Sequence, residues 1–249
     1  MIKPTFKYIN DLTPADWIYK NLTPLDWEIF DPLSSLIPKG FESYISIRHD
    51  NALCEEDEGS NIDWEIFTKN LIPFTTTPDD CFYALWNGYG INFEENQAEL
   101  FTRLDENKNV VPLSSEEIRY LEFPLQRQYM LFQGKLLDSL NLNYNDPLWH
   151  GRERPNYAWP SDKSWIYFNE IDFEVTLLGG SEELISAIER NPLYKTERFL
   201  PETLVKDIYL VAPWNMPDIS EFDQNRRRHI SLRSRVSSAI ISLGFRVRG

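Results

Sequence analysis

The segment from Ser164 to Leu178 constrains the fold more than any other part of the chain. It contains no glycine or proline, and eight of its fifteen residues are aromatic or β-branched, the types that favour extended backbone. Gly179 and Gly180 end this run, and a helical pattern then extends from Ser181 to Arg190. The sequence therefore predicts one long strand followed directly by a helix.

Other parts of the chain complete a sheet. Strand patterns are predicted at residues 41–48, 81–87, 128–133 and 207–211. The proline- and tryptophan-rich residues 155–162 are predicted as a loop, and residues 91–123 as an excursion from the sheet. This order predicts an α+β fold, a mainly antiparallel sheet with flanking helices in a single domain. We expect Trp86, Tyr129, Phe132, Trp165 and Phe173 to share one core.

The first seventy residues repeat a short helix-start pattern. Thr13-Pro14-Ala15-Asp16 is echoed by Thr23-Pro24-Leu25-Asp26, and the six residues from Ile62 to Phe67 match those from Leu25 to Phe30 at all but the first position. In such a pattern the threonine caps the helix and proline occupies its first turn. The simplest interpretation is a set of helical turns that each pin one tryptophan to the core, and a binding repeat is the alternative.

Charge and cysteine content restrict the functional classes. The formal net charge is -14, which disfavours sequence-independent binding of nucleic-acid backbones. The two cysteines, Cys54 and Cys81, are too few for a disulfide framework and fit a reducing compartment. The residues after Met1 lack the apolar core of a secretory signal. We therefore expect a cytoplasmic protein that does not bind a membrane.

The C-terminal segment has the opposite charge. After Asp223 the chain has seven arginines and no acidic residue. Leu232, Val236, Ile240 and Leu243 recur at helical spacing. We predict that residues 1–223 form the globular domain and that residues 224–249 form an arginine-rich helix docked on it. A nucleic-acid-binding arm is the alternative.

Several strings resemble an uncharacterised bacterial protein family. They are Trp86-x-Gly88-Tyr89-Gly90, Arg127-x-Tyr129-x-Leu131-Phe132-x-Gly134, Pro155-x-x-x-Trp159-Pro160-x-Asp162-x-x-Trp165, Glu170-Ile171-Asp172 and Gly179-Gly180-Ser181. The resemblance covers roughly residues 36–190. No activity is assigned to the family, so the resemblance implies no catalytic residue.

Three acidic residues on the predicted long strand are the main candidates for chemistry. Glu170, Asp172 and Glu174 would share one face, because side chains alternate along a strand. Adjacent carboxylates need solvent, an arginine such as Arg127 or Arg154, or a cation. Two of them could also act as acid and base in glycan hydrolysis. A solvated sheet face is the alternative without chemistry.

Other candidates are weaker. His49 follows a predicted strand and precedes Asp50, so it is a possible general base, with a surface histidine as the alternative. As ligand-binding residues we predict Arg127, Trp159, Asp162 and Glu174. Gly179-Gly180-Ser181 could hold an anion or simply form a turn and a helix cap. No cofactor motif or metal-ligand spacing is present, so we expect neither cofactor nor metal.

Two hypotheses of different class follow. The first is a non-catalytic protein-binding module, of the immunity type, whose acidic and aromatic surface takes a basic protein partner. The second is a carboxylate-dependent hydrolase that acts on glycans through Glu170 and Asp172, beside Trp159 and Trp165. The position of Glu170 and Asp172, in a concave pocket or on a flat face, separates the two.

Overall fold

The computed structural model describes residues 7–24, 31–48, 62–87, 102–104, 110–113, 115–123, 127–141, 155–169 and 175–205. All of these residues belong to one compact unit, Met1–Leu210. The strand predicted at 207–211 and the helix predicted for 224–249 lie outside the described residues.

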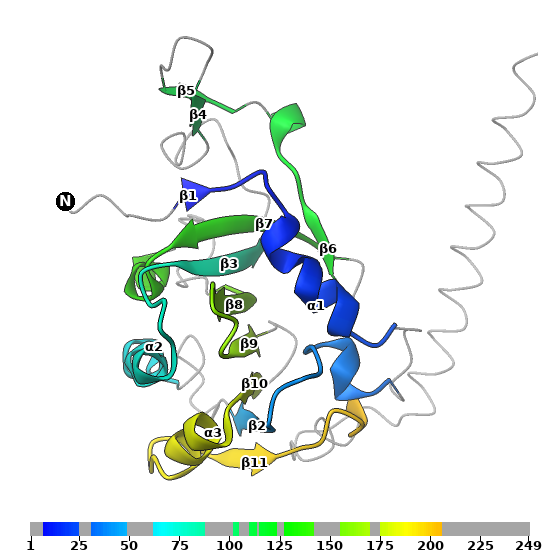
Figure 1. Ribbon diagram of the computed structural model, residues 1–249, viewed down its shortest axis with the longest axis vertical. Coiled ribbons are helices and arrows are strands. Elements are labelled where there is room, and N and C mark those ends of the chain that lie inside the picture. The colour runs from blue at the N-terminus through cyan, green and yellow to red at the C-terminus, as the bar shows by residue number, and fades with distance from the viewer. Residues whose placement is uncertain are drawn as a thin grey trace, which may run out of the picture. The chain divides into compact units, whose positions relative to one another are not determined.

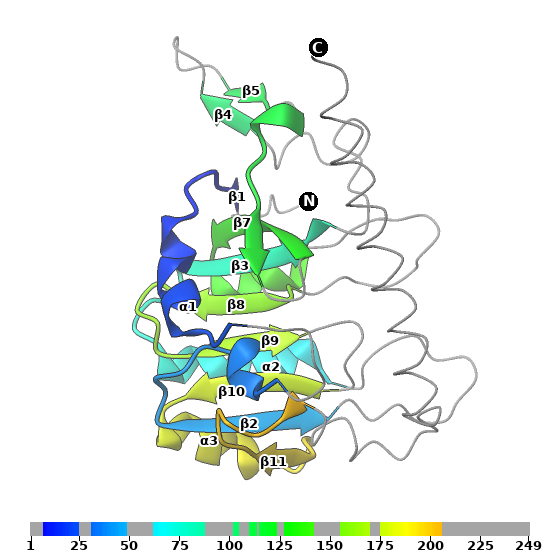
Figure 2. The ribbon, with the colours of Figure 1, turned by 90° about the vertical axis from the view of Figure 1, so that its right-hand side faces the viewer.

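An antiparallel sheet runs through the described part of the chain in the order β1-β7-β3-β8-β9-β10-β2-β11, and β6 also pairs with β7. Its strands are β1 (Lys7–Tyr8), β2 (Ser43–Arg48), β3 (Cys81–Trp86), β6 (Leu121–Phe123), β7 (Arg127–Gly134), β8 (Tyr157–Pro160), β9 (Ile166–Asn169), β10 (Val175–Gly180) and β11 (Thr196–Arg198). The hairpin of β4 (Thr102–Leu104) and β5 (Val110–Pro112) is separate from the sheet. Figure 2 shows the strands of the sheet side by side. The predicted α+β fold is confirmed.

Helices cover both faces of the sheet. Figure 1 shows α2 (Trp64–Leu71) and α3 (Glu182–Glu189) on one face and α1 (Asp16–Asn21) on the other. Short 3-10 turns complete the layers: η1 (Thr13–Ala15), η2 (Leu33–Ser35), η3 (Ile72–Phe74), η5 (Ser115–Glu117) and η7 (Leu136–Asn141). No helix within the described ranges is long and apolar enough to cross a membrane.

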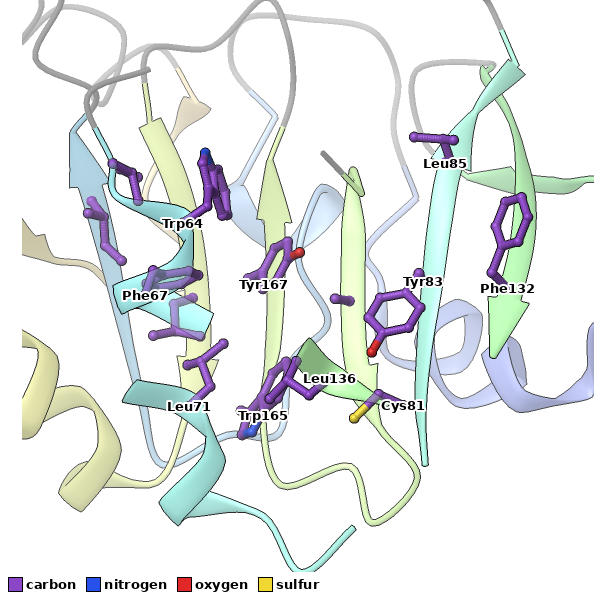
Figure 3. Close-up of a cluster of buried hydrophobic side chains, with 14 of the residues drawn as sticks. Trp64, Phe67, Leu71, Cys81, Tyr83, Leu85, Phe132, Leu136, Trp165 and Tyr167 are labelled. Atoms are coloured by element: carbon purple, nitrogen blue, oxygen red, sulfur yellow. The ribbon is translucent and has the colours of Figure 1, made fainter. Parts of the chain in front are cut away.

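Each face of the sheet has its own hydrophobic core, so the predicted single core is wrong. Phe132 and Trp165 lie in the α2/α3 core, whereas Tyr129 lies in the α1 core with Trp86 packed against it. The reason is strand periodicity, because neighbouring residues of a strand point to opposite faces. Figure 3 shows α2 directing Trp64, Phe67 and Leu71 toward the sheet in the α2/α3 core. Phe173 lies outside the described residues.

The predicted long strand is a β-hairpin. The segments β9 and β10 pair antiparallel, with Thr176 opposite Asn169 and Leu178 opposite Tyr167. The chain therefore reverses direction between Asn169 and Val175. A run without glycine or proline does not reveal such a turn, because Asp172 is the one common turn residue among residues 170–174.

Two local predictions also need correction. Residues 157–160 form β8, a fully buried central strand, rather than a loop. The two prolines do not interrupt it, because Pro155 precedes the strand and Pro160 is its last residue. The backbone N–H of Thr13 bonds to Asp11 Oδ1 at 3.0 Å, so Asp11 rather than the threonine hydroxyl supports the first helical turn. The helix predicted from Ser181 is confirmed, with the Ser181 side chain accepting from the N–H of Leu184.

Candidate functional site

Six neighbouring strands bring polar and aromatic residues together at one end of the sheet. We call this the loop end, and it comprises Arg48, Trp86, Arg127, Asn156, Asn169 and Val175. The register places Arg48 opposite Val175, and Asn169 opposite the next residue of β10. The N–H of Asn156 bonds to Ala84 O, which brings Asn156 to the end of β3. The loop end is thus fixed by backbone pairing across the sheet.

A chain of side-chain hydrogen bonds crosses four strands at the loop end. Asn156 Oδ1 accepts from the Trp86 N–H at 2.9 Å, and Asn156 Nδ2 donates to Asn169 O at 3.1 Å. Thr176 Oγ1 then donates to Asn169 Oδ1 at 3.3 Å. Asn156 and Thr176 are buried, so these bonds satisfy polar groups that would otherwise be costly to bury. The chain therefore holds the strand ends in register.

Arg127 lies at the loop end, where its guanidinium carbon is 4.3 Å from the centroid of the Trp86 ring. This contact is a cation–π interaction, which stabilises both side chains. Trp86 itself packs against the α1 core. The ligand-binding role predicted for Arg127 stays a prediction.

The predicted acidic and histidine candidates adjoin the loop end in the sequence. His49 follows Arg48, Glu170 follows Asn169, and Glu174 precedes Val175. All three, together with Asp172, lie outside the described residues. The predicted arrangement of Glu170, Asp172 and Glu174 along one face of a continuous strand is wrong, because β9 and β10 form a hairpin.

Trp159 is in the interior rather than on a binding surface. Its side chain is fully buried, and its ring stacks on Phe82 with a centroid distance of 5.7 Å. Trp165 is also fully buried but belongs to the core on the opposite face of the sheet. The two rings therefore do not form the aromatic platform that the glycan hypothesis requires.

Asp162 ties two turns together. Its Oδ2 accepts from Thr75 Oγ1 at 2.9 Å, from the Thr76 N–H at 2.6 Å and from Thr76 Oγ1 at 2.8 Å, while its Oδ1 accepts from the Ser164 N–H at 3.0 Å. Partial burial opposes ionisation, but the hydrogen bonds from Ser164 and Thr76 outweigh it and lower the pKa of Asp162 to about 2. This carboxylate has a structural role.

In the segment Gly179-Gly180-Ser181, the two glycines form the close-packed end of β10 and Ser181 caps α3. A Cβ on Gly179 would lie 2.8 Å from the ring of Phe41. The N–H of Glu182 bonds to a carboxylate oxygen of Glu42 at 3.0 Å. The Glu42 carboxylate therefore already binds a free N–H at the first turn of α3, where an external anion would bind. This contact favours the predicted helix cap over the predicted anion site.

An additional feature, which we call the edge groove, has no counterpart in the sequence analysis. It has a volume of about 470 Å³ and is lined by Gly40, Phe41, Glu42, Ser43, Tyr44, Arg198, Phe199, Leu200, Pro201 and Thr203. Its walls come from the start of β2 and the end of β11, at the far end of β2 from Arg48. Segments this distant in sequence meet only through sheet pairing, so no local pattern indicates the groove.

Within the described ranges, no group of three or more histidine, cysteine, aspartate or glutamate residues could hold a metal ion. No model of a protein family, no curated protein and no solved structure matches the chain.

Proposed function

We propose that the protein is a non-catalytic binding module that takes a basic protein partner at the loop end. The supporting observation is that the strand ends gathered there continue into acidic segments. Residues 49–61 contain five acids, residues 88–101 three and residues 170–174 three, and none of these segments has a lysine or arginine. Neighbouring strands thus join the most acidic parts of the chain to one end of the sheet.

Such an arrangement suits recognition of a basic surface. Clustered charge of one sign steers a partner of the opposite sign and accelerates association. The Asn156 hydrogen-bond chain keeps the strand ends in a defined geometry, which reduces the entropy lost on binding. The bulk of the protein supplies a rigid base with two hydrophobic cores.

The hydrolase hypothesis has less support. It required Glu170 and Asp172 at a fixed separation on one strand, beside the exposed faces of Trp159 and Trp165. Because β9 and β10 form a hairpin, strand geometry no longer sets the separation of these two carboxylates. Both tryptophan rings are fully buried. We therefore propose binding rather than glycan hydrolysis.

Charge removal at the loop end tests the proposal. The probe is a synthetic peptide of alternating arginine and glycine residues, with binding to the full chain followed by fluorescence anisotropy. We expect the double variant Glu170→Gln/Asp172→Asn to weaken binding about fivefold at low salt, because exposed ion pairs each contribute up to about 1 kcal/mol. High salt should abolish the difference.

The matched control removes two carboxylates elsewhere. Glu183 and Asp79 are exposed, just after β10 and just before β3, at the opposite end of the sheet from the loop end. The double variant Glu183→Gln/Asp79→Asn should bind the peptide within about twofold of the unmodified chain. Equal losses in the two double variants would show that only net charge matters, and absence of binding by the unmodified chain would contradict the proposal.

A further inference from the structure

The edge groove has an aromatic floor. The Phe41 and Tyr44 rings meet edge to face with centroids 5.9 Å apart, and the Tyr44 and Phe199 rings are 5.6 Å apart. Tyr44 Oη accepts from the Phe41 N–H and donates to Pro38 O. The tyrosine hydroxyl is therefore engaged inside the protein. Tyr44 and Phe199 are only 4% and 8% exposed, so the half-buried Phe41 supplies most of the ring surface that a ligand can reach. Leu200, which is 70% exposed, adds apolar surface at the rim.

Arg198 lines the groove, but its charge is neutralised. Its Nη1 and Nη2 contact the two carboxylate oxygens of Glu182 at 2.9 and 2.7 Å, and its Nε and Nη2 contact Glu189 at 2.9 to 3.3 Å. The hydroxyls of Ser43 and Ser186 receive further bonds from the guanidinium. All five N–H groups of the guanidinium thus have acceptors, and no donor remains for an anionic ligand.

The charge around the groove is negative. The two negative charges of Glu182 and Glu189 together exceed the single positive charge of Arg198. Glu42 lines the groove, and Glu202 is close enough to Tyr44 to raise the pKa of its hydroxyl, although burial is the main cause of that increase. An aromatic floor with an acidic rim suits a cation on an aliphatic stem, because the stem packs on the rings and the head faces the carboxylates.

We propose that the edge groove binds a lysine or arginine side chain, flanked by an apolar residue that covers Leu200, from a basic protein segment. This inference rests on the proposed function, because it gives the same class of partner a second contact on the protein. The charge complementarity carries it: two glutamates saturate Arg198, and Glu42, whose Oε2 also accepts from the Glu182 N–H, adds a negative charge beside the aromatic floor.

Binding of short peptides to the full chain tests the groove. The basic probe is acetyl-Leu-Arg-Leu-Arg-amide and the matched probe is acetyl-Leu-Glu-Leu-Glu-amide, with binding followed through the backbone amide signals of Phe41 and Arg198 by NMR. The basic peptide should shift these signals and bind at least about fivefold more tightly than the acidic one. Equal or tighter binding of the acidic peptide at these positions would overturn the inference.

Two conservative substitutions locate the contact. Glu42→Gln keeps an oxygen for the Glu182 N–H but removes the charge, and Leu200→Ser removes exposed apolar surface. Each should weaken the basic peptide about threefold to fivefold. The controls are Glu183→Gln and Leu193→Ser, since Leu193 is also exposed, at 62%, but does not line the groove. Controls that weaken the peptide as much as the groove variants would contradict the assignment.

The two proposals fail separately. Glu170→Gln/Asp172→Asn should leave the peptide-induced shifts at Phe41 and Arg198 unchanged, because Asn169 and Val175, which flank this segment, lie at the opposite end of the sheet from the groove. If Glu42→Gln and Leu200→Ser have no effect while the loop-end variant still weakens the arginine–glycine peptide, the groove inference is wrong and the proposed function stands. If the short basic peptide depends on Glu42 and Leu200 while the loop-end variant has no effect, the groove stands without the loop end.

Discussion

Leu177 lies directly opposite Phe168 across the β9–β10 hairpin, and both side chains are buried in the α1 core. In a continuous strand these two residues would point to opposite faces and lie roughly 30 Å apart. Their pairing therefore defines the topology of the segment that dominates the sequence.

A double-mutant cycle on this pair should detect the contact. We expect Phe168→Ala and Leu177→Ala to couple by about 0.5–1 kcal/mol in the free energy of unfolding, as opposed cross-strand pairs do. Chemical denaturation of the four proteins measures the coupling. Additive effects within about 0.3 kcal/mol would show that the side chains do not touch.

Trp165 should be among the most sensitive positions of the α2/α3 core. Its side chain is fully buried, so Trp165→Ala should lower the free energy of unfolding by about 3–5 kcal/mol. Urea denaturation measures the loss. Leu193→Ala, at an exposed leucine, serves as the control and should change stability by less than about 0.5 kcal/mol.

Asp162 should make stability depend on pH in the acidic range. Its pKa is about 2 in the folded protein against an ordinary value of 3.8, so its contribution to stability is fully present above pH 3.8 and is lost as the pH falls through 2. Asp162→Ala should therefore destabilise the protein by about 1–2 kcal/mol at neutral pH and progressively less below pH 4. Asp79→Ala, at an exposed carboxylate, is the control. A pH-independent difference between Asp162→Ala and the unmodified chain would exclude this role.

Lys163 adopts a backbone conformation that favours glycine. Its φ is 58°, and the turn is closed by its N–H bonding to Pro160 O at 2.9 Å. Left-handed backbone costs an L-residue roughly 1–2 kcal/mol, so Lys163→Gly should raise the free energy of unfolding by about 0.5–1 kcal/mol. Thermal denaturation measures the change. Lys163→Ala removes the same ammonium, which lies 5.9 Å from the Trp17 ring, but keeps the strain, so it should not stabilise the protein.

Gly179 should tolerate no side chain. A Cβ there would lie 2.8 Å from the ring of Phe41 and 2.9 Å from that of Tyr44. Gly179→Ala should cost about 1–3 kcal/mol through overpacking and should disturb the floor of the edge groove. Gly40→Ala is the comparison, because it tests backbone strain without overpacking: a Cβ added there would meet no atom within 4 Å, but the φ of Gly40 is +114°. A neutral Gly179→Ala would show that the two rings can move apart.

Much of the local structure is determined by the sequence alone. The β2 strand follows from alternation, and β3 and β7 follow from apolar runs typical of buried strands. The α3 helix follows from the helical spacing of Leu184, Ile185 and Ile188 and from the Ser181 cap. These patterns arise among near neighbours, so the sequence reveals them before the rest of the fold is known. The excursion predicted for residues 91–123 is confirmed for the β4–β5 hairpin but is wrong for β6, which pairs with β7 in the main sheet.

The tertiary structure decided the hairpin between Asn169 and Val175, the separation of two cores and the roles of Trp159 and Asp162. A strand and a hairpin of the same composition differ only in which residues face each other, and that choice depends on the cross-strand partners that β2 and β8 provide. Burial of Trp159 depends on Phe82 of β3, and the bonds of Asp162 depend on the turn at residues 75–77. The edge groove likewise exists only because β11 pairs with β2, some 150 residues away in the sequence, a contact that no local pattern encodes.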